Sequence, residues 1–238
     1  EELERRGIGV DVGVGRVPIV SSACLFDLAC GEPDVRPTAA DGARAAALAL
    51  DGPHGPLACG NHGAGTGCTV GKFLGPERAM KSGLGEHVER AGKLVCGAVA
   101  AVNALGNVVD PATGAPVAGA LAQDGRSIAV DADPIAAVAA AAPWLRSNTT
   151  ISCVVTNARL TKAQATKVAQ MSADAYAHAI RPTHTTNDGD TVYVMATGSV
   201  EAPVDAVGML AVRALEGAIV RGAREARSAY GFTAACDL

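Results

Sequence analysis

Aromatic side chains, charge and long apolar segments are all scarce in this sequence. Its 238 residues include three Phe, three Tyr and one Trp, and 18% are charged against 49% that are hydrophobic. This balance excludes a disordered polyelectrolyte, and it requires a core made of aliphatic side chains and alanine. The formal net charge is −4, without a basic block, so binding to nucleic acid through its phosphates is not expected.

Segments that would lead the chain into or across a membrane are also missing. The longest apolar run, residues 135–142, ends at Pro143 and is far shorter than the ~20 residues that span a bilayer. The charged start lacks the apolar stretch of a secretory signal. Seven cysteines with irregular spacing do not resemble a disulfide framework. We therefore expect a protein of the reducing cytoplasm that makes no membrane contact.

Apolar periodicity and turn residues predict a mixed α/β organisation. Helices are predicted at residues 1–6, 39–50, 131–142 (after a short linker), 161–180 and 204–229. Strands are predicted at residues 18–28, 93–102 (continued by 108–109), 150–156 and 191–197. Thr161 is expected to cap its helix. Because the elements mix without a repeating βαβ period, we expect layered sheets covered by helices.

A glycine-rich loop at residues 57–75 suggests a phosphate site, but its spacing does not fit one. A phosphate loop needs glycine where Thr66 stands and Ser or Thr where Phe73 stands, and a dinucleotide fingerprint needs glycine at Cys68. We interpret the loop as backbone that packs tightly beside another segment. It could line a site, to which Lys72 would bring the only cation.

Patterns for metal binding or a serine triad are incomplete. Cys59, His62 and Cys68 lack the second close pair of Cys or His that completes a tetrahedral site. There is no G-x-S-x-G elbow, and Ser21 and Ser22 lie in an apolar stretch where hydroxyls usually satisfy backbone groups. Neither chemistry is therefore expected.

Two polar segments stand at the start of predicted strands. Residues 148–150 read Asn-Thr-Thr, and residues 188–190, about forty positions later, read Asp-Gly-Asp. Taken separately, adjacent threonines reflect strand propensity and Asp-Gly indicates a turn. If the two strands are neighbours, however, both carboxylates can point at one hydroxyl.

Together with Thr-Asn-x-Arg after the first strand and His-Thr before the acidic pair, these segments resemble the self-cleaving DmpA/NylC family. The family includes L-aminopeptidase/D-esterases and 6-aminohexanoate-oligomer hydrolases. The Asn148-Thr149 junction and the Asp188/Asp190 pair are most similar to the oligomer-hydrolase branch, since a seryl nucleophile marks the aminopeptidases. Further segments in the family's order are residues 17–23, the loop ending at Gly71-Lys72, and residues 102–106. The resemblance covers essentially the whole chain.

The resemblance implies a four-layer α/β/β/α sandwich of the N-terminal-nucleophile (Ntn) type. Self-cleavage would give a larger subunit, residues 1–148, and a smaller one, residues 149–238, which stay together as one structural domain. It also implies a homo-oligomer of four or more such units and no metal or organic cofactor. Family members carry a further N-terminal stretch that supplies an active-site tyrosine. We therefore expect that the larger subunit is truncated, or that part of the site comes from elsewhere.

The resemblance also assigns the nucleophile and its acidic partners. Thr149 would attack the carbonyl of Asn148, and water would cleave the resulting ester. The freed α-amino group would then act as general base for the hydroxyl of Thr149. Asp188 and Asp190 would position the ammonium and hydroxyl of that residue and would titrate as a coupled pair.

Two further polar residues have roles by the same similarity. Asn103 would donate its side-chain amide to the developing oxyanion, although it would equally serve as a turn residue before Gly106. Lys72 would support that charge or tune the amine, unless it is a solvated surface lysine.

The leading hypothesis is a self-processed amide hydrolase that acts through an acyl-Thr149 intermediate. Its substrates would be small peptides, amides or linear amide oligomers such as those of 6-aminohexanoate. One alternative is an aminopeptidase/D-esterase acting on amides and esters with a free amino end. Others are acyl transfer like that of the related ornithine acetyltransferases, whose cleavage motif differs, and a non-catalytic ligand-binding relative. The expected partners are the substrate and further copies of the chain.

Overall fold

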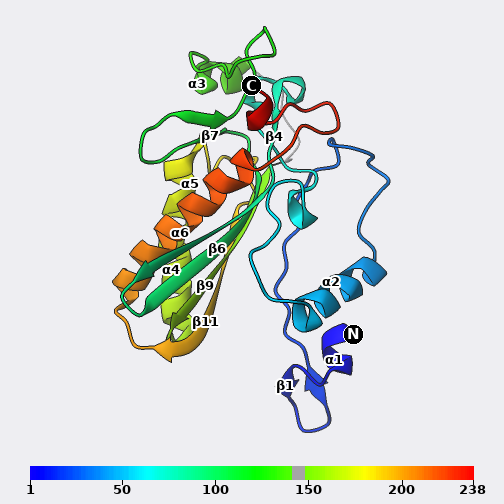
Figure 1. Cartoon of the computed structure of the whole chain (residues 1–238), viewed down its shortest axis with the longest axis vertical. Coiled ribbons are helices and arrows are strands. Elements are labelled where there is room, and N and C mark those ends of the chain that lie inside the picture. Colours follow the sequence, from blue (N-terminus) through cyan, green and yellow to red (C-terminus); the bar gives the residue numbers. More distant parts are fainter. Residues whose placement is uncertain (141–147) are drawn as a thin grey trace. The chain divides into compact units, whose positions relative to one another are not determined.

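The computed structural model describes residues 1–140 and 148–238, which form two compact units (Figure 1). The smaller unit comprises Glu1–Cys24 and Glu32–Pro56, and the larger comprises Leu25–Gly31 and Leu57–Leu238. The junction expected to be cleaved lies inside the larger unit. The division of the chain into two subunits at that junction stays a prediction.

The smaller unit contains two helices and a short hairpin. These elements are α1 (Glu2–Arg5), β1 (Val10–Asp11), β2 (Arg16–Val17) and α2 (Ala39–Asp51). Helix α2 begins with a capping box, in which the side chains of Thr38 and Asp41 each accept the other's backbone N–H. Arg6, after α1, donates two hydrogen bonds of 2.5 Å to Asp51 at the end of α2. Both helices confirm the sequence predictions.

The strand predicted at residues 18–28 was wrong. Ile19 and Val20 are 75% and 67% exposed, and their backbone pairs with no other strand in the part of the chain that the structure describes. An extended segment becomes a strand only when a neighbouring backbone shares its hydrogen bonds. The β-branched composition of this stretch does not by itself supply that neighbour.

The larger unit is built on a four-stranded sheet in the order β11-β9-β6-β5. Its strands are β5 (Leu84–Ala91), β6 (Leu94–Asn103), β9 (Thr149–Ala158) and β11 (Thr191–Val200). Neighbours are antiparallel except for β9 and β11, which are parallel. Because parallel strands need a crossover connection, helices lie between these two in the sequence. The strands predicted at 93–102, 150–156 and 191–197 are confirmed.

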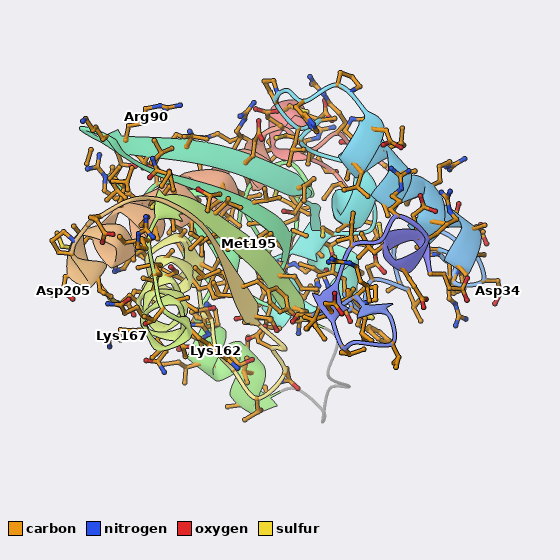
Figure 2. The ribbon with its side chains drawn as sticks, turned by 90° about the horizontal axis from the view of Figure 1, so that it is seen from below. Asp34, Arg90, Lys162, Lys167, Met195 and Asp205 are labelled. Atoms are coloured by element: carbon orange, nitrogen blue, oxygen red, sulfur yellow. The ribbon has the colours of Figure 1, made fainter. Side chains whose placement is uncertain are left out.

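Three helices cover one face of this sheet: α4 (Lys162–Ser172), α5 (Asp174–Ala179) and α6 (Val204–Arg224). Helix α6 packs across β5 and β6, and α4 packs against α6 and β11 (Figure 1). In Figure 2, Lys162 and Lys167 mark α4, and Asp205 marks the start of α6. The predicted α/β class is confirmed. Within the described residues, no helix is both long and apolar enough to cross a membrane.

Two helix boundaries differ from the prediction, and side-chain hydrogen bonds explain both. The helix predicted at 161–180 is split at Ala173, where the Ser172 hydroxyl donates to the carbonyl of Val168 at 2.7 Å, a bond that often bends helices. The last helix ends at Arg224 instead of residue 229. Beyond that end, the side chain of Asn61 binds both the N–H and the carbonyl of Arg227, which takes this backbone out of the helix.

The remaining strands form two small sheets, and one further α-helix is short: β3 (Thr69–Val70), β4 (Met80–Lys81), β7 (Asn107–Val109), β8 (Pro116–Ala118), α3 (Pro134–Ala140) and β10 (Ile180–Arg181). Residues 108–109 were expected to continue β6, but β7 instead joins β10 and β8 in a separate sheet. At Gly106, between β6 and β7, a Cβ would lie 2.1 Å from the carbonyl oxygen of Pro182. This close approach redirects the chain. Helix α3 confirms the alanine-rich helix up to residue 140, and its expected last two residues lie outside the described residues.

The core between sheet and helices is aliphatic and rich in alanine, as predicted. Its fully buried small side chains include Ala100, Ala211, Ala214 and Ala218. Backbones approach closely as a result. A Cβ on Gly85 of β5 would lie 2.0 Å from the carbonyl oxygen of Ala218 and 2.4 Å from the nitrogen of Gly222, both on α6.

The other face of the sheet carries exposed apolar side chains. Val88, Val155 and Met195 are 49%, 39% and 60% exposed, and Met195 is labelled on β11 in Figure 2. Because side chains alternate along a strand, Thr149 lies on this face, together with every second residue up to Val155. The larger unit thus builds one helix layer and one sheet layer of the expected sandwich.

We predict that Gly85→Ala lowers the free energy of unfolding of the larger unit by about 3 kcal/mol, because the added methyl group overlaps the backbone of α6. Chemical denaturation followed by circular dichroism measures this change. Gly97→Ala is the matched control in the neighbouring strand β6, since its methyl group would meet only ordinary contacts at 3.6 Å or more. Equal stability of both variants would contradict this account of the β5–α6 contact.

Candidate active site

The expected nucleophile and Asn103 meet at one end of the four-stranded sheet. Thr149 is the first residue of β9, Asn103 is the last residue of β6, and the antiparallel register pairs them directly. Opposed residues of an antiparallel pair have side chains on the same face, about 5 Å apart at Cβ. The strand pairing therefore brings together two residues that are 46 positions apart in the sequence.

The Asn148–Thr149 peptide lies beside the loop that leads into β11. The nitrogen of Asn148 donates to the carbonyl of Asn187 at 3.3 Å, and the nitrogen of Gly189 donates to the carbonyl oxygen of Asn148 at 2.9 Å. The Thr149 hydroxyl donates to the same carbonyl oxygen at 2.5 Å. This carbonyl is thus polarised by a backbone N–H and contacted by the hydroxyl of the next residue.

Gly189 allows this contact because it has no side chain. A Cβ at this position would lie 3.0 Å from the hydroxyl oxygen of Thr149, tighter than ordinary packing. The glycine between the two aspartates therefore lets the loop backbone reach the peptide bond of Asn148.

The carboxylates of Asp188 and Asp190 both accept hydrogen bonds from nearby residues. Asp188 accepts hydrogen bonds from the N–H and the hydroxyl of Thr185 at 2.8 and 2.7 Å, which is the turn chemistry that Asp-Gly suggested. Asp190 accepts from the N–H of Thr150 at 2.8 Å. Among the described residues, the Thr149 hydroxyl bonds to the Asn148 carbonyl and to neither carboxylate. While the peptide is intact, the acidic pair thus flanks Gly189, whose backbone contacts the Asn148 carbonyl.

Asp190 is largely removed from water, with 8% of its side chain exposed. Burial raises the pKa of this carboxyl group because it disfavours the charged form. The N–H of Thr150 lowers the pKa by binding the charged form, and the like charge of Asp188 raises it. The charge of Asp188 therefore influences the titration of Asp190.

Lys72 and Asn103 form a buried polar pair. The ammonium of Lys72 donates to the Oδ1 atom of Asn103 at 2.7 Å, and the N–H of Thr69 donates to the same oxygen at 3.1 Å. These two donors fix the orientation of the amide, whose nitrogen donates to the carbonyl of Phe26 at 2.9 Å. One of its two N–H groups is thereby engaged in the larger unit.

Lys72 is a buried cation, not a solvated surface lysine, because only 8% of it is exposed. Burial lowers the pKa of its ammonium from 10.5 to about 8, and the negative charge of Asp188 works in the opposite direction. The glycine loop holds the residue in place. Gly71 has a φ of 74°, and the N–H of Lys72 donates to the carbonyl of Leu105 at 2.8 Å.

The glycine-rich loop packs tightly, as its sequence suggested. Added Cβ atoms at Gly65 and Gly71 would lie 2.2 and 2.0 Å from backbone nitrogens. A second cation in this loop was not predicted from the sequence. The fully buried ammonium of Lys81 donates to the carbonyls of Gly65, Cys68 and Ser82 at 2.6–3.1 Å. A lysine beside an apolar strand carries no pattern that would have revealed this role.

Two other features of the site were also missed. The N–H of Gly189 is a backbone group that only the strand pairing brings to Asn148. Tyr176 is 1% exposed, and its hydroxyl lies 2.8 Å from the Ser152 hydroxyl and 3.2 Å from the carbonyl of Thr150. Its only sequence signal is that it is a lone aromatic residue on an alanine-rich helix. In the described part of the chain, no group of three or more His, Cys, Asp or Glu residues is arranged for a metal ion.

Comparisons with known proteins agree with this architecture. The Burkholderia β-aminopeptidase structure aligns with a TM-score of 0.51 at 21% identity, covering 79% of this chain and 54% of that one. The L-aminopeptidase/D-Ala-esterase/amidase of Ochrobactrum anthropi, described as a variant of the Ntn hydrolase fold, aligns with a TM-score of 0.50 at 20% identity. That match covers 74% of this chain and 47% of the other. The fold is therefore of the Ntn hydrolase class.

Sequence similarity gives the family. Residues 8–236 match peptidase family S58, and the chain belongs to this family of peptidase-type hydrolases. An uncharacterized aminopeptidase of Mycobacterium tuberculosis is 36% identical over 259 aligned residues, which cover all of this chain and 71% of the relative. A 6-aminohexanoate-oligomer endohydrolase of Kocuria is 30% identical over 205 residues, which cover 85% of this chain and 55% of that enzyme. The expected family resemblance is confirmed.

We predict that Lys72 makes the free energy of unfolding rise with pH in the alkaline range. Its pKa is about 8, so below that pH the folded chain buries a charged ammonium, which lowers the free energy of unfolding. Between pH 8 and 10.5 the unfolded chain binds the proton and the folded chain does not, so stability rises with pH. The difference in unfolding free energy between the unaltered chain and Lys72→Met should therefore change by up to about 3 kcal/mol from pH 7 to 10.5.

Denaturant titrations at both pH values measure this difference. Lys162→Met is the matched control, because Lys162 is exposed on α4. Its stability should follow the pH dependence of the unaltered chain. If Lys72→Met follows that dependence too, Lys72 is not a buried cation.

Proposed function

We propose that the protein is a self-processed amide hydrolase whose nucleophile is the hydroxyl of Thr149. The observation that carries this proposal is the contact at the Asn148 carbonyl, where the Thr149 hydroxyl lies 2.5 Å and the Gly189 nitrogen 2.9 Å from the same oxygen. A hydroxyl beside the preceding carbonyl, with a donor aimed at its oxygen, is the arrangement that an N-to-O acyl shift requires.

In the shift, the Thr149 hydroxyl loses its proton and attacks the carbonyl carbon of Asn148. The N–H of Gly189 stabilises the negative charge that develops on the carbonyl oxygen. The C–N bond then breaks, the nitrogen of Thr149 takes up a proton, and Asn148 is left as an ester on the hydroxyl. Water cleaves this ester into the Asn148 carboxylate and a free N-terminal threonine.

The strand geometry favours Thr149 over its neighbour. Side chains alternate along β9, so Thr150 points toward the helices, where its hydroxyl is buried without a hydrogen-bond partner among the described residues. Thr149 points to the face that carries Asn103. Only the first of the two threonines therefore shares a face with Asn103.

After processing, the α-amino group of Thr149 would act as general base for the hydroxyl, since its ordinary pKa is near 8. Asp188 and Asp190 flank the glycine that contacts Asn148, and we propose that they orient the ammonium form. The pair of Lys72 and Asn103 supplies positive charge and amide N–H on the other side. A substrate carbonyl would be attacked between these two groups, and an acyl-threonine ester would form.

We propose small peptides, amides or linear amide oligomers as substrates. The names of relatives support both branches, because one is called a 6-aminohexanoate-oligomer endohydrolase and another an aminopeptidase. Hydrolysis of amino-acid amides and esters with a free amino end is therefore the second candidate. Association of the processed units into a homo-oligomer, in the cytoplasm, completes the proposal.

The first prediction from this mechanism is cleavage at a single junction. Denaturing electrophoresis and N-terminal sequencing of mature protein should show two fragments, the smaller beginning at Thr149. Thr149→Val should remain a single polypeptide without hydrolase activity, and Thr149→Ser should still be processed because it keeps a hydroxyl. Thr150→Val is the matched control and should be processed normally. An uncut unaltered chain, or a cut Thr149→Val chain, would refute the assignment.

The second prediction concerns the acidic pair. Asp190→Ala should slow processing by about 100-fold or more while the fold persists, because the carboxylate that holds the N–H of Thr150 is removed. The rate is measured as the loss of full-length chain over time. Asp205→Ala, an exposed carboxylate at the start of α6, is the control and should mature at the normal rate. If Asp190→Ala matures at the normal rate, the acidic pair serves only to form a turn.

A further inference from the structure

A histidine contacts the oxygen of the buried carboxylate that does not bind Thr150. The Nδ1 atom of His184 lies 3.3 Å from the Oδ2 atom of Asp190, and the histidine side chain is 45% exposed. The other carboxylate oxygen, Oδ1, accepts the N–H of Thr150. Asp190 thus bridges the imidazole and the strand that begins with Thr149.

The backbone and a neighbouring ring hold His184 in this position. Its φ is 54°, in the left-handed region that side chains other than glycine seldom adopt. Its ring lies 5.6 Å from that of Tyr176, between centroids, at an interplanar angle of 58°. An uncommon backbone conformation that directs a side chain onto a buried charge is typical of a functional position.

The charged surroundings of Asp190 give His184 a distinct role. Asp188, from the same loop, is a like charge. Tyr176, from α5, is a phenol whose pKa is raised by burial, so it stays neutral. The hydroxyl of Thr183 and the N–H of Thr150 are uncharged donors. Among the described residues, His184 is therefore the side chain in contact with Asp190 that can carry a positive charge.

We propose that His184 is a positioning residue, whose imidazolium keeps Asp190 ionised and holds it on the N–H of Thr150. The proposal rests on the proposed function, since Asp190 matters to catalysis only if the acidic pair serves Thr149. It adds a residue and a pH dependence. Processing and hydrolysis would persist in mild acid because positive charge on His184 opposes the protonation of Asp190.

The sign follows from the charges. Burial raises the pKa of Asp190, and the positive charge of His184 lowers it. Burial and the charge of Asp188 both raise this pKa. When the charge of His184 is removed, the pKa is higher and the carboxylate is protonated at a higher pH. The acidic limb of the rate profile should therefore move toward neutral pH, while the rate at pH 8 changes little.

The variant that separates charge from hydrogen bonding is His184→Asn. Asparagine tolerates the left-handed conformation, and its amide nitrogen takes the place of Nδ1 without a titratable charge. The full chain is synthesised in a cell-free system and transferred to buffers from pH 5 to 9, and loss of uncut polypeptide is followed. Relative to the unaltered chain, we expect processing to be about tenfold slower at pH 5 and within about twofold at pH 8.

A control and a second readout make the test decisive. His178→Asn removes the histidine that pairs with Glu216 away from the site, and it should leave the profile unchanged. In the uncut Thr149→Val chain, the side-chain carboxyl carbon of Asp190 is titrated by carbon-13 NMR and identified by its loss in Asp190→Asn. His184→Asn should move this titration to higher pH. This measurement requires neither processing nor hydrolysis.

The outcomes separate the two proposals. If Asp190→Asn matures normally while His184→Asn still shifts the titration of Asp190, the positioning contact is upheld and the role proposed for the acidic pair fails. If neither the titration nor the acidic limb moves in folded His184→Asn, the inference about His184 is overturned whatever Asp190 does. A similar loss of processing at pH 5 and pH 8, with the titration in place, would show a structural role only and would also overturn it.

Discussion

The carbonyl oxygen of Asn148 is the point on which the site is assembled. It accepts the N–H of Gly189 and the hydroxyl of Thr149, and both contacts depend on the parallel pairing of β9 and β11. Because these strands run side by side in the same direction, the loop that enters β11 lies next to the residue that precedes β9. The hydrogen bonds that form the sheet thus also determine which peptide bond is polarised.

Burial acts on the charged groups around this carbonyl in opposite directions. It lowers the pKa of Lys72 to about 8 and raises the pKa of Asp190, so each group moves toward the neutral range where proton transfer is most useful. Hydrogen bonds compensate the free-energy cost of burying these two charges. Lys72 is bound by Asn103, and Asp190 is bound by Thr150 and contacted by His184. The sheet therefore stays stable although the pKa values of Lys72 and Asp190 are shifted.

How much of this was predictable depends on whether the cause is local. The strands at 150–156 and 191–197 and the capped helix at 39–50 follow from composition, alternation and capping residues, and the structure forms them. That Asn148-Thr149 and Asp188-Gly189-Asp190 meet follows from one further assumption, that the strands are neighbours. The failed strand at 18–28 needed a partner that its composition does not specify. The bond from Asn103 to the carbonyl of Phe26 could not be foreseen either, because it depends on where a distant loop packs.

The two faces of the sheet divide the work of the site. On the helix face, the hydroxyl of Tyr176 lies within 3.2 Å of the carbonyls of Thr150 and Thr191, which stand near the start of β9 and at the start of β11. Burial raises the pKa of this phenol, so it stays a neutral donor and stiffens the two strand ends without adding charge. On the other face, Thr149 lies opposite Asn103, which binds the ammonium of Lys72. Rigid support from one side and reactive groups on the other are what precise positioning of a nucleophile demands.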